Sequence, residues 1–146
     1  MKTRLYILSL TIIIFIAFAC SKNPKCWGEN KNKGIINEEI RIDYTQFDKE
    51  QYIITNDSMY RKTFPENIDI PTIDFNEYTL LGLYASGQCE IKFIREVTKI
   101  ESEKRYYYEV KVKSCGWCKK EGYSYNWVTV PKLPDAWTVS FEVIEK

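Results

Sequence analysis

The feature that most restricts how this chain can fold is a two-residue alternation of apolar and polar side chains, which recurs from residue 35 onward. Successive side chains of a strand point to opposite sides, so this period favours strands, as do the β-branched and aromatic residues at the apolar positions. In the clearest segment, one face would carry Trp137, Val139, Phe141 and Val143. We predict strands over residues 35–44, 51–55, 79–85, 89–99, 105–114, 123–132 and 137–144.

A single short helix is expected between the second and third of these strands. The triplet Asn56-Asp57-Ser58 predicts its start, because a short polar side chain accepts a hydrogen bond from the free N–H groups of a first turn. Met59, Tyr60 and Phe64 would form its buried side, and Pro65 would end it. About seven strands and one short helix favour a mostly β fold, either a small antiparallel β-sandwich or an open barrel.

The segment 79–85 differs from the other predicted strands because it is apolar at nearly every position. A continuous apolar run of this length predicts a central strand that is covered on both faces. The dipeptide Ser86-Gly87 follows directly and is expected to end the strand.

Segments 89–99 and 105–114 are expected to form the two arms of a hairpin. The register that we predict places Phe93 opposite Val110, so that apolar residues of both arms share one face. A slip of one residue would place Phe93 opposite Lys111 and would mix the core and solvent faces, which disfavours that register.

The N-terminus has the parts of an export signal. Lys2 and Arg4 give a positive start, and the apolar run 5–18 follows. That run is too short to span a bilayer comfortably, which takes about 20 residues. Ala17-Phe18-Ala19 then supplies small residues at the two positions that a signal peptidase reads. Residues 1–19 are therefore predicted to be a signal peptide.

Cys20 comes directly after these small residues, an arrangement that resembles the lipobox of bacterial lipoproteins. The resemblance implies that Cys20 is acylated and anchors the protein in a lipid bilayer of the cell envelope, the outer membrane being our expectation. Ordinary secretory cleavage, with Cys20 as an odd cysteine, is the alternative. Residues 20–34 are polar and rich in Gly and Pro and read as a tether, which leaves residues 35–146 as a single β-rich domain.

Charge and composition exclude several classes of function. Without the two basic residues of the export signal, 19 of the 21 Lys and Arg remain against 20 acidic residues, a balance that argues against nucleic acid as a partner. The chain contains no histidine, which excludes Ser-His-Asp triads and His-containing zinc sites. No carboxylate pair, phosphate-binding loop or nucleophile elbow stands out, so we expect neither an enzyme nor a cofactor.

Four further cysteines follow Cys20, namely Cys26, Cys89, Cys115 and Cys118. Export favours disulfides, and four cysteines allow three pairings. The predicted hairpin brings Cys89 near Cys115 and Cys118, so we expect Cys89 to pair with one of them and Cys26 with the other. Cys115-Gly116-Trp117-Cys118 also has the spacing of a redox dithiol, although it lies between strands and not at a helix N-terminus. A zinc site of four cysteines is the weakest reading, and no metal is expected.

Aromatic residues alternate along the predicted strand 123–132. Tyr123, Tyr125 and Trp127 would lie on one face of it. If that face were exposed, it could stack on sugars or on a peptide, whereas a buried face would simply be core, which is the commoner outcome.

The C-terminal half carries short segments that resemble a known family: Ile73-Asp74-Phe75, Tyr78-Thr79-Leu80-Leu81-Gly82, Cys115-Gly116-Trp117-Cys118, Asn126-Trp127-Val128 and Val130-Pro131-Lys132-Leu133-Pro134. Over roughly residues 68–146 the chain resembles the PrcB-like C-terminal domain, named after a lipoprotein subunit of a surface protease complex. The resemblance implies a non-catalytic accessory or binding role. Where the family usually has Thr-Gly-Gly-Tyr, this chain has Ser86-Gly87-Gln88-Cys89.

These observations lead to three hypotheses of function. The main one is a non-enzymatic, lipid-anchored envelope protein that binds another envelope protein, which the resemblance suggests is a protease. The second is a protease inhibitor that uses loops at one end of a β-sandwich. The third is a thiol oxidoreductase that uses Cys115 and Cys118. The residues expected to contact a partner are Ser86, Gly87, Gln88, Gly116, Trp117, Pro134 and Trp137.

Overall fold

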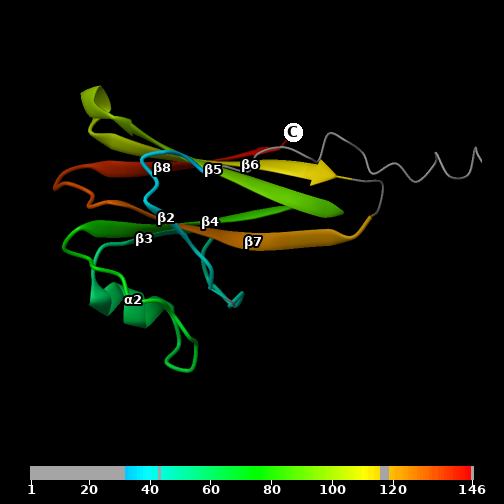
Figure 1. Cartoon of the computed structure of the whole chain (residues 1–146), viewed down its shortest axis with the longest axis horizontal. Coiled ribbons are helices and arrows are strands. Elements are labelled where there is room, and N and C mark those ends of the chain that lie inside the picture. Colours follow the sequence, from blue (N-terminus) through cyan, green and yellow to red (C-terminus); the bar gives the residue numbers. More distant parts are fainter. Residues whose placement is uncertain (1–31, 43, 116–118, 146) are drawn as a thin grey trace, which may run out of the picture.

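The computed structural model describes residues 32–42, 44–115 and 119–145. In this part of the chain, eight strands form two four-stranded sheets that pack face to face as a β-sandwich (Figure 1), which confirms the expected fold class. The elements in chain order are β1 (Lys33–Gly34), β2 (Glu38–Ile40), β3 (Gln51–Ile54), α2 (Asp57–Thr63), β4 (Tyr78–Gln88), β5 (Glu90–Ile100), the 3-10 turn η2 (Glu101–Glu103), β6 (Arg105–Cys115), β7 (Glu121–Pro131) and β8 (Thr138–Glu145).

The strand order is β1-β5-β6-β8 in the first sheet and β2-β7-β4-β3 in the second. The long strands pair in antiparallel fashion, β5 with β6 and β4 with β7. The two edge strands of the first sheet run parallel to their neighbours, β1 to β5 and β8 to β6. That sheet is therefore mixed and not purely antiparallel as expected, because the loop after β7 carries the chain across from the second sheet before β8 begins.

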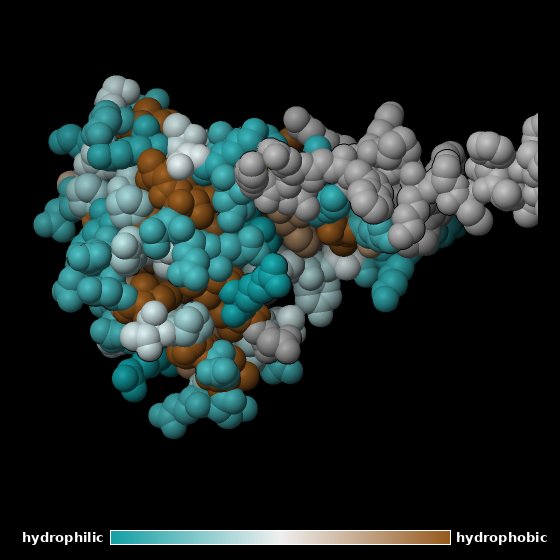
Figure 2. Space-filling view, viewed as in Figure 1, coloured by the Kyte–Doolittle hydropathy of each residue, from teal (hydrophilic) through white to brown (hydrophobic). Residues whose placement is uncertain are grey.

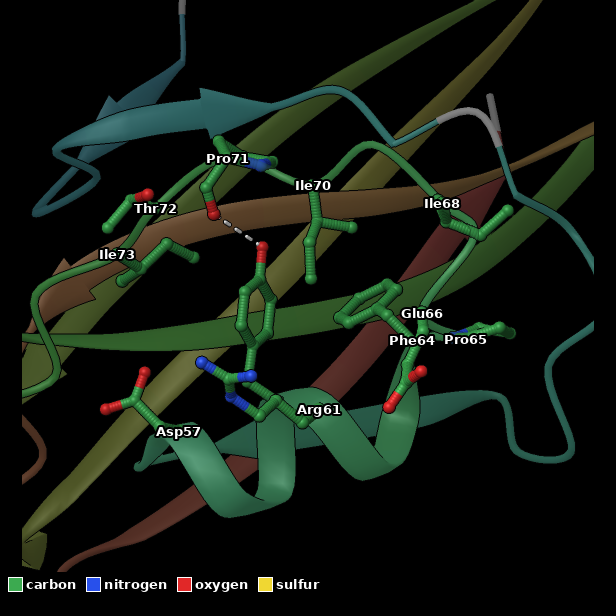
Figure 3. A pocket seen from close by; sticks show the side chains of 11 residues that line it. Asp57, Arg61, Phe64, Pro65, Glu66, Ile68, Ile70, Pro71, Thr72 and Ile73 are labelled. Atoms are coloured by element: carbon green, nitrogen blue, oxygen red, sulfur yellow. Dashed lines mark hydrogen bonds between the residues drawn. The ribbon is translucent and has the colours of Figure 1, made fainter.

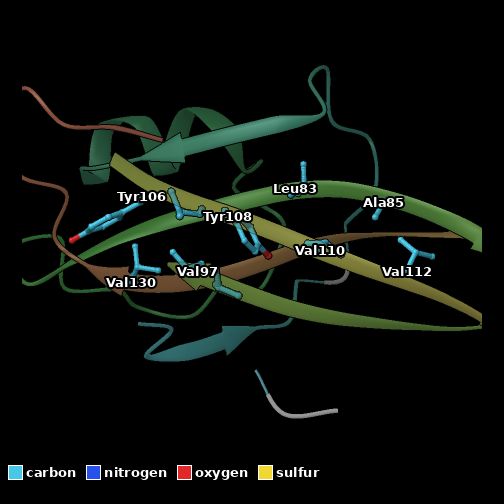
Figure 4. Close-up of a cluster of buried hydrophobic side chains, with 10 residues drawn as sticks. Leu83, Ala85, Val97, Tyr106, Tyr108, Val110, Val112 and Val130 are labelled. Carbon is cyan, nitrogen blue, oxygen red and sulfur yellow. The ribbon is translucent and has the colours of Figure 1, made fainter. Parts of the chain in front are cut away.

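The main core lies between the two sheets (Figure 4). It is built from the inward-facing side chains of the four long strands: Leu81, Leu83, Ala85, Val97, Tyr106, Tyr108, Val110, Val112, Val128 and Val130. Trp137, Val139 and Phe141 of the last segment pack against it, as their alternation predicts. Val143 shares that side of β8 but is 39% exposed.

A second core covers the outer side of the second sheet. Helix α2 and the loop that follows it pack there over β4 and β7 (Figure 1), and the buried members are Ile40, Tyr52, Ile54, Tyr60, Phe64, Ile73, Phe75, Leu80 and Trp127. Strand β4 is therefore central and buried on both faces, as predicted. In the same view, Figure 2 shows brown hydrophobic residues reaching the surface among teal hydrophilic ones in the lower part of the domain, where α2 lies.

Helix α2 forms where the polar triplet predicts it. The side chain of Asn56 caps it by accepting a hydrogen bond of 2.9 Å from the backbone N–H of Met59. Tyr60 and Phe64 are buried as expected. The expectation that Met59 is buried was wrong, since its side chain is 41% exposed. With only seven residues, the helix turns a narrow side towards the sheet, and Met59 lies outside it.

The β5–β6 hairpin has a register shifted by two residues from the predicted one. Phe93 lies opposite Val112 and not opposite Val110. A shift of two keeps every side chain on its predicted face, so the core assignment survives the error. The turn explains the shift. The predicted register leaves only Glu101-Ser102 as the loop between the strands. A two-residue loop in the favoured type I′ turn needs positive φ at both of these residues. Instead the loop extends to Lys104, which alone adopts a left-handed φ of 49°.

Two predicted strand boundaries also differ from the structure. The segment 35–44 contains only the short β2, and the chain just before β2 crosses from β1 in the first sheet to the second sheet. The dipeptide Ser86-Gly87 does not end β4, which continues to Gln88 because β7 pairs with it along its whole length. The sharp bend follows at Cys89, whose φ is 64°.

Candidate partner-binding surface

A row of aromatic side chains runs along the outer side of β7, as the alternation predicts. Tyr125 and Trp127 stack with ring centroids 6.1 Å apart. Phe47, from the loop before β3, lies over both, at 4.3 Å from the Tyr125 ring and 5.3 Å from the Trp127 ring. Trp127 is thus part of the second core, and this end of the row is structural.

The other end of the row extends beyond this cover. Tyr123 is 56% exposed, and its ring centroid lies 5.9 Å from that of Tyr84 on β4, with 30° between the ring planes. Tyr84 in turn meets the edge of Tyr125 at 5.3 Å. We call Tyr84, Tyr123 and Tyr125 the tyrosine face. Sequence reasoning found the two tyrosines of β7 but missed Tyr84, because only the β4–β7 pairing places Tyr84 beside Tyr125.

The hydroxyl of Tyr125 ties the tyrosine face to the loop before β3. It donates a hydrogen bond of 3.0 Å to the backbone carbonyl of Lys49. Burial raises the pKa of Tyr125, and nearby Tyr84, Glu50 and Asp48 raise it further, so the hydroxyl stays protonated and keeps donating near neutral pH. The tyrosine face is therefore held on one side by the loop before β3 and is open on the other.

The residues predicted to contact a partner do not meet at one edge. Ser86, Gly87 and Gln88 are the last residues of β4, beside the tyrosine face. Pro134 and Trp137 lie beyond the opposite end of the same strand pair, because β7 ends at Pro131 opposite Tyr78, whereas Gln88 lies opposite Glu121. Gly116 and Trp117 lie outside the described residues. An inhibitory edge made jointly by these loops is therefore not formed by the described ones.

Trp137 has a packing role in the structure. Its ring is partly buried against the main core and meets the edge of Tyr106 at 5.6 Å. The ammonium group of Lys99 lies 5.0 Å from the ring centroid, as in a cation–π contact. These contacts join the β5–β6 hairpin to the loop before β8.

Cys89 is the cysteine whose side chain lies within the described residues. Cys89 is disulfide-bonded, and its backbone N–H donates a 2.8 Å hydrogen bond to the carbonyl of Lys120. The side chains of Cys20, Cys26, Cys115 and Cys118 lie outside the described parts, so the pairing and the redox hypothesis stay predictions. Among the described residues, no group of three His, Cys, Asp or Glu side chains is arranged to hold a metal ion.

A pocket of about 480 Å³ lies between α2 and the loop after it (Figure 3). Tyr60 lines this pocket, and its hydroxyl donates a hydrogen bond of 2.9 Å to the carbonyl of Pro71. Burial raises the pKa of Tyr60 to about 12, so this phenol is neutral at physiological pH. Asp57 and Arg61 of α2 also line the pocket (Figure 3). The arrangement ties the loop to the helix.

Comparison with known proteins gave no relative: no family model, no curated protein and no solved structure matches the chain. The resemblance to the PrcB-like domain therefore stays a prediction. No helix within the described residues is sufficiently long and apolar to cross a membrane. The proposed signal peptide and lipid anchor lie outside those residues.

Proposed function

We propose that this protein is a non-enzymatic module of the bacterial cell envelope, anchored by acyl chains on Cys20, that binds another protein through the tyrosine face. The observation that carries the proposal is the exposure of Tyr123 beside Tyr84 at the uncovered end of an otherwise packed aromatic row. Tyrosine is enriched at protein interfaces because it offers a large rigid apolar surface with a polar tip.

The support beneath the tyrosine face favours binding. Strands β4 and β7 pair over eleven residues each, so Tyr84 and Tyr123 stand on a rigid ribbon and lose little freedom when a partner binds. Tyr84 also packs against Tyr125, whose hydroxyl is tied to Lys49. Truncating a tyrosine that is a hot spot at the centre of an interface costs about 2 kcal/mol or more.

The proposal is tested by photocrosslinking in intact cells. A photoreactive phenylalanine replaces Tyr123, and the matched control carries it at Tyr107, a partly exposed tyrosine of β6 in the other sheet. We expect a discrete crosslinked protein from position 123 and none from position 107. The same crosslink from both positions, or none from position 123, would overturn the proposal.

The lipid anchor is examined in the same cells with Cys20→Ser. We expect this variant to leave the membrane fraction and to lose the crosslink from position 123, because its partner is in the envelope. A Cys20→Ser protein that still floats with membranes would contradict the anchor but would leave the binding surface standing.

A further inference from the structure

Strand β4 is longer than the strand that borders its free edge. β3 covers β4 only from Leu80 to Leu83. The last contact along this edge is the hydrogen bond of 2.8 Å from the N–H of Tyr84 to the carbonyl of Glu50. Before Glu50 the chain leaves the edge and lies over the outer face, where the Lys49 carbonyl accepts the Tyr125 hydroxyl. Beyond Tyr84, no described strand pairs with this edge of β4.

Ser86 is the residue whose backbone is left open by this geometry. Alternate residues of a strand turn their N–H and C=O groups to the same side, so those of Ser86 point to the side on which Tyr84 bonds Glu50. The next residue of that set, Gln88, already donates its N–H to the Ser114 hydroxyl at 3.1 Å. Ser86 therefore offers one donor and one acceptor in line with the end of β3.

A groove runs beside this open edge. It has a volume of about 560 Å³ and is lined by Ser86, Gly87, Gln88, Ser114, Glu121 and Glu145. Val143 lies two residues before Glu145 on the same side of β8 and is 39% exposed, because the short β3 does not cover this end of the sandwich. An exposed apolar side chain therefore lies on the same side of β8 as Glu145, which lines the groove.

The rim of the groove is acidic. Glu121 and Glu145 are exposed, and neither forms an ion pair with any described residue. Two exposed carboxylates that form no ion pair with a described residue, beside an open backbone, favour a segment that brings a Lys or Arg side chain.

We infer that an extended segment of the partner protein adds to the β4 edge at Ser86, in line with β3, and places an aliphatic side chain near Val143 and a Lys or Arg near Glu145. The inference rests on the proposed function, since it names the part of the partner that binds. Strand addition draws its affinity from backbone hydrogen bonds and its specificity from alternate side chains. It also explains an exposed edge that natural sheets normally protect.

The probe is an oriented library of nine-residue peptides with Lys fixed at the centre, compared with a library that has Glu there. The full mature chain is the bait. We expect the Lys library to yield peptides with aliphatic residues two positions from the Lys, since alternate residues share a face. Ser86→Pro removes the N–H and should weaken binding of a selected peptide about tenfold. Ser86→Ala keeps the N–H and removes only the hydroxyl group, so it should weaken binding less than Ser86→Pro.

Proline is tolerated on an edge strand whose N–H faces outward, so Ser86→Pro should fold, and its thermal midpoint verifies this. Glu145→Lys gives a second measurement and should reverse the preference to the Glu library. The inference fails if no peptide is enriched on the wild type, if Ser86→Pro binds as well as Ser86→Ala, or if Glu145→Lys leaves the preference unchanged. If the crosslink from position 123 persists in that event, the proposed function stands without the strand addition.

Discussion

At the scale of single residues, the second core depends on a close contact between Gly82 and Trp127. The two residues lie opposite each other in the β4–β7 pair. A Cβ atom at position 82 would lie 2.2 Å from Cζ3 of the indole ring. The indole is fully buried beneath Phe47, Tyr52 and other rings, so it has no room to move aside.

We therefore expect Gly82→Ala to lower the free energy of unfolding by about 3 kcal/mol, since overpacking of a closed core forces strain on its neighbours. The matched control is Gly122→Ala, whose Cβ would meet only the terminal Cδ1 of Ile91 at 2.9 Å and should cost about 1 kcal/mol or less. Urea unfolding followed by tryptophan fluorescence measures both. Equal losses for the two variants would contradict the account of Gly82.

At the scale of elements, the sequence predicted correctly those helices and strands whose bounds are determined by neighbouring residues. The cap residue Asn56 and the alternation of residues 137–144 gave the helix and the last strand nearly at their true bounds. The hairpin register escaped prediction because it depends on the turn, where Lys104 alone takes a left-handed conformation. Tyr84, one of the three residues of the tyrosine face, also escaped prediction, since nothing near it in sequence shows that β7 brings Tyr123 beside it.

The Tyr60 hydroxyl, which links α2 to the loop after it through a hydrogen bond to Pro71, predicts a loss of stability at alkaline pH. Burial raises the pKa of Tyr60 to about 12, whereas an unfolded chain has a tyrosine pKa of about 10. The folded state therefore holds this proton more tightly. The resulting contribution to stability is complete below about pH 10 and is lost as the pH rises towards about 12.

Urea unfolding of the wild type and Tyr60→Phe across that range tests this expectation. The variant should be about 1 kcal/mol less stable near neutral pH, because it loses the hydrogen bond to Pro71. Its stability should then fall less steeply above about pH 10. Identical slopes for the two proteins would show that Tyr60 does not carry the effect. Tyr52, whose pKa burial also raises to about 12, keeps some slope in the variant.

At the scale of the whole molecule, an ion pair joins the two sheets. Glu39 belongs to β2 in the second sheet and Arg95 to β5 in the first, and their side chains meet at 3.0 Å. The Arg95 side chain is only 12% exposed, so its charge depends on this partner.

We expect Glu39→Gln to lower the free energy of unfolding by about 2 kcal/mol, less than for a fully buried pair because Glu39 is partly exposed. The matched control is Glu103→Gln, which breaks an exposed pair with Arg105 in the hairpin turn and should cost about 0.5 kcal/mol or less. Adding Arg95→Met to Glu39→Gln should restore part of the loss, because it removes the unpaired charge. Chemical denaturation measures all four proteins, and a double variant weaker than Glu39→Gln would refute this reading.

The pairing of β2 with β7 also affects how fast the domain folds during and after synthesis. The hydroxyl of Thr129 reaches the carbonyl of Glu38 across 91 residues of sequence. Contacts of such long range make folding slow, on the order of milliseconds to seconds. The chain loses the entropy of closing a large loop before the stabilising contacts between the strands can form. The ribosome synthesises β2 long before β7, so β2 has no strand to pair with until nearly the entire domain has been made. We expect nascent or truncated chains that lack β7 and β8 to leave one edge of β4 and one edge of β6 unpaired, and therefore to depend on a chaperone.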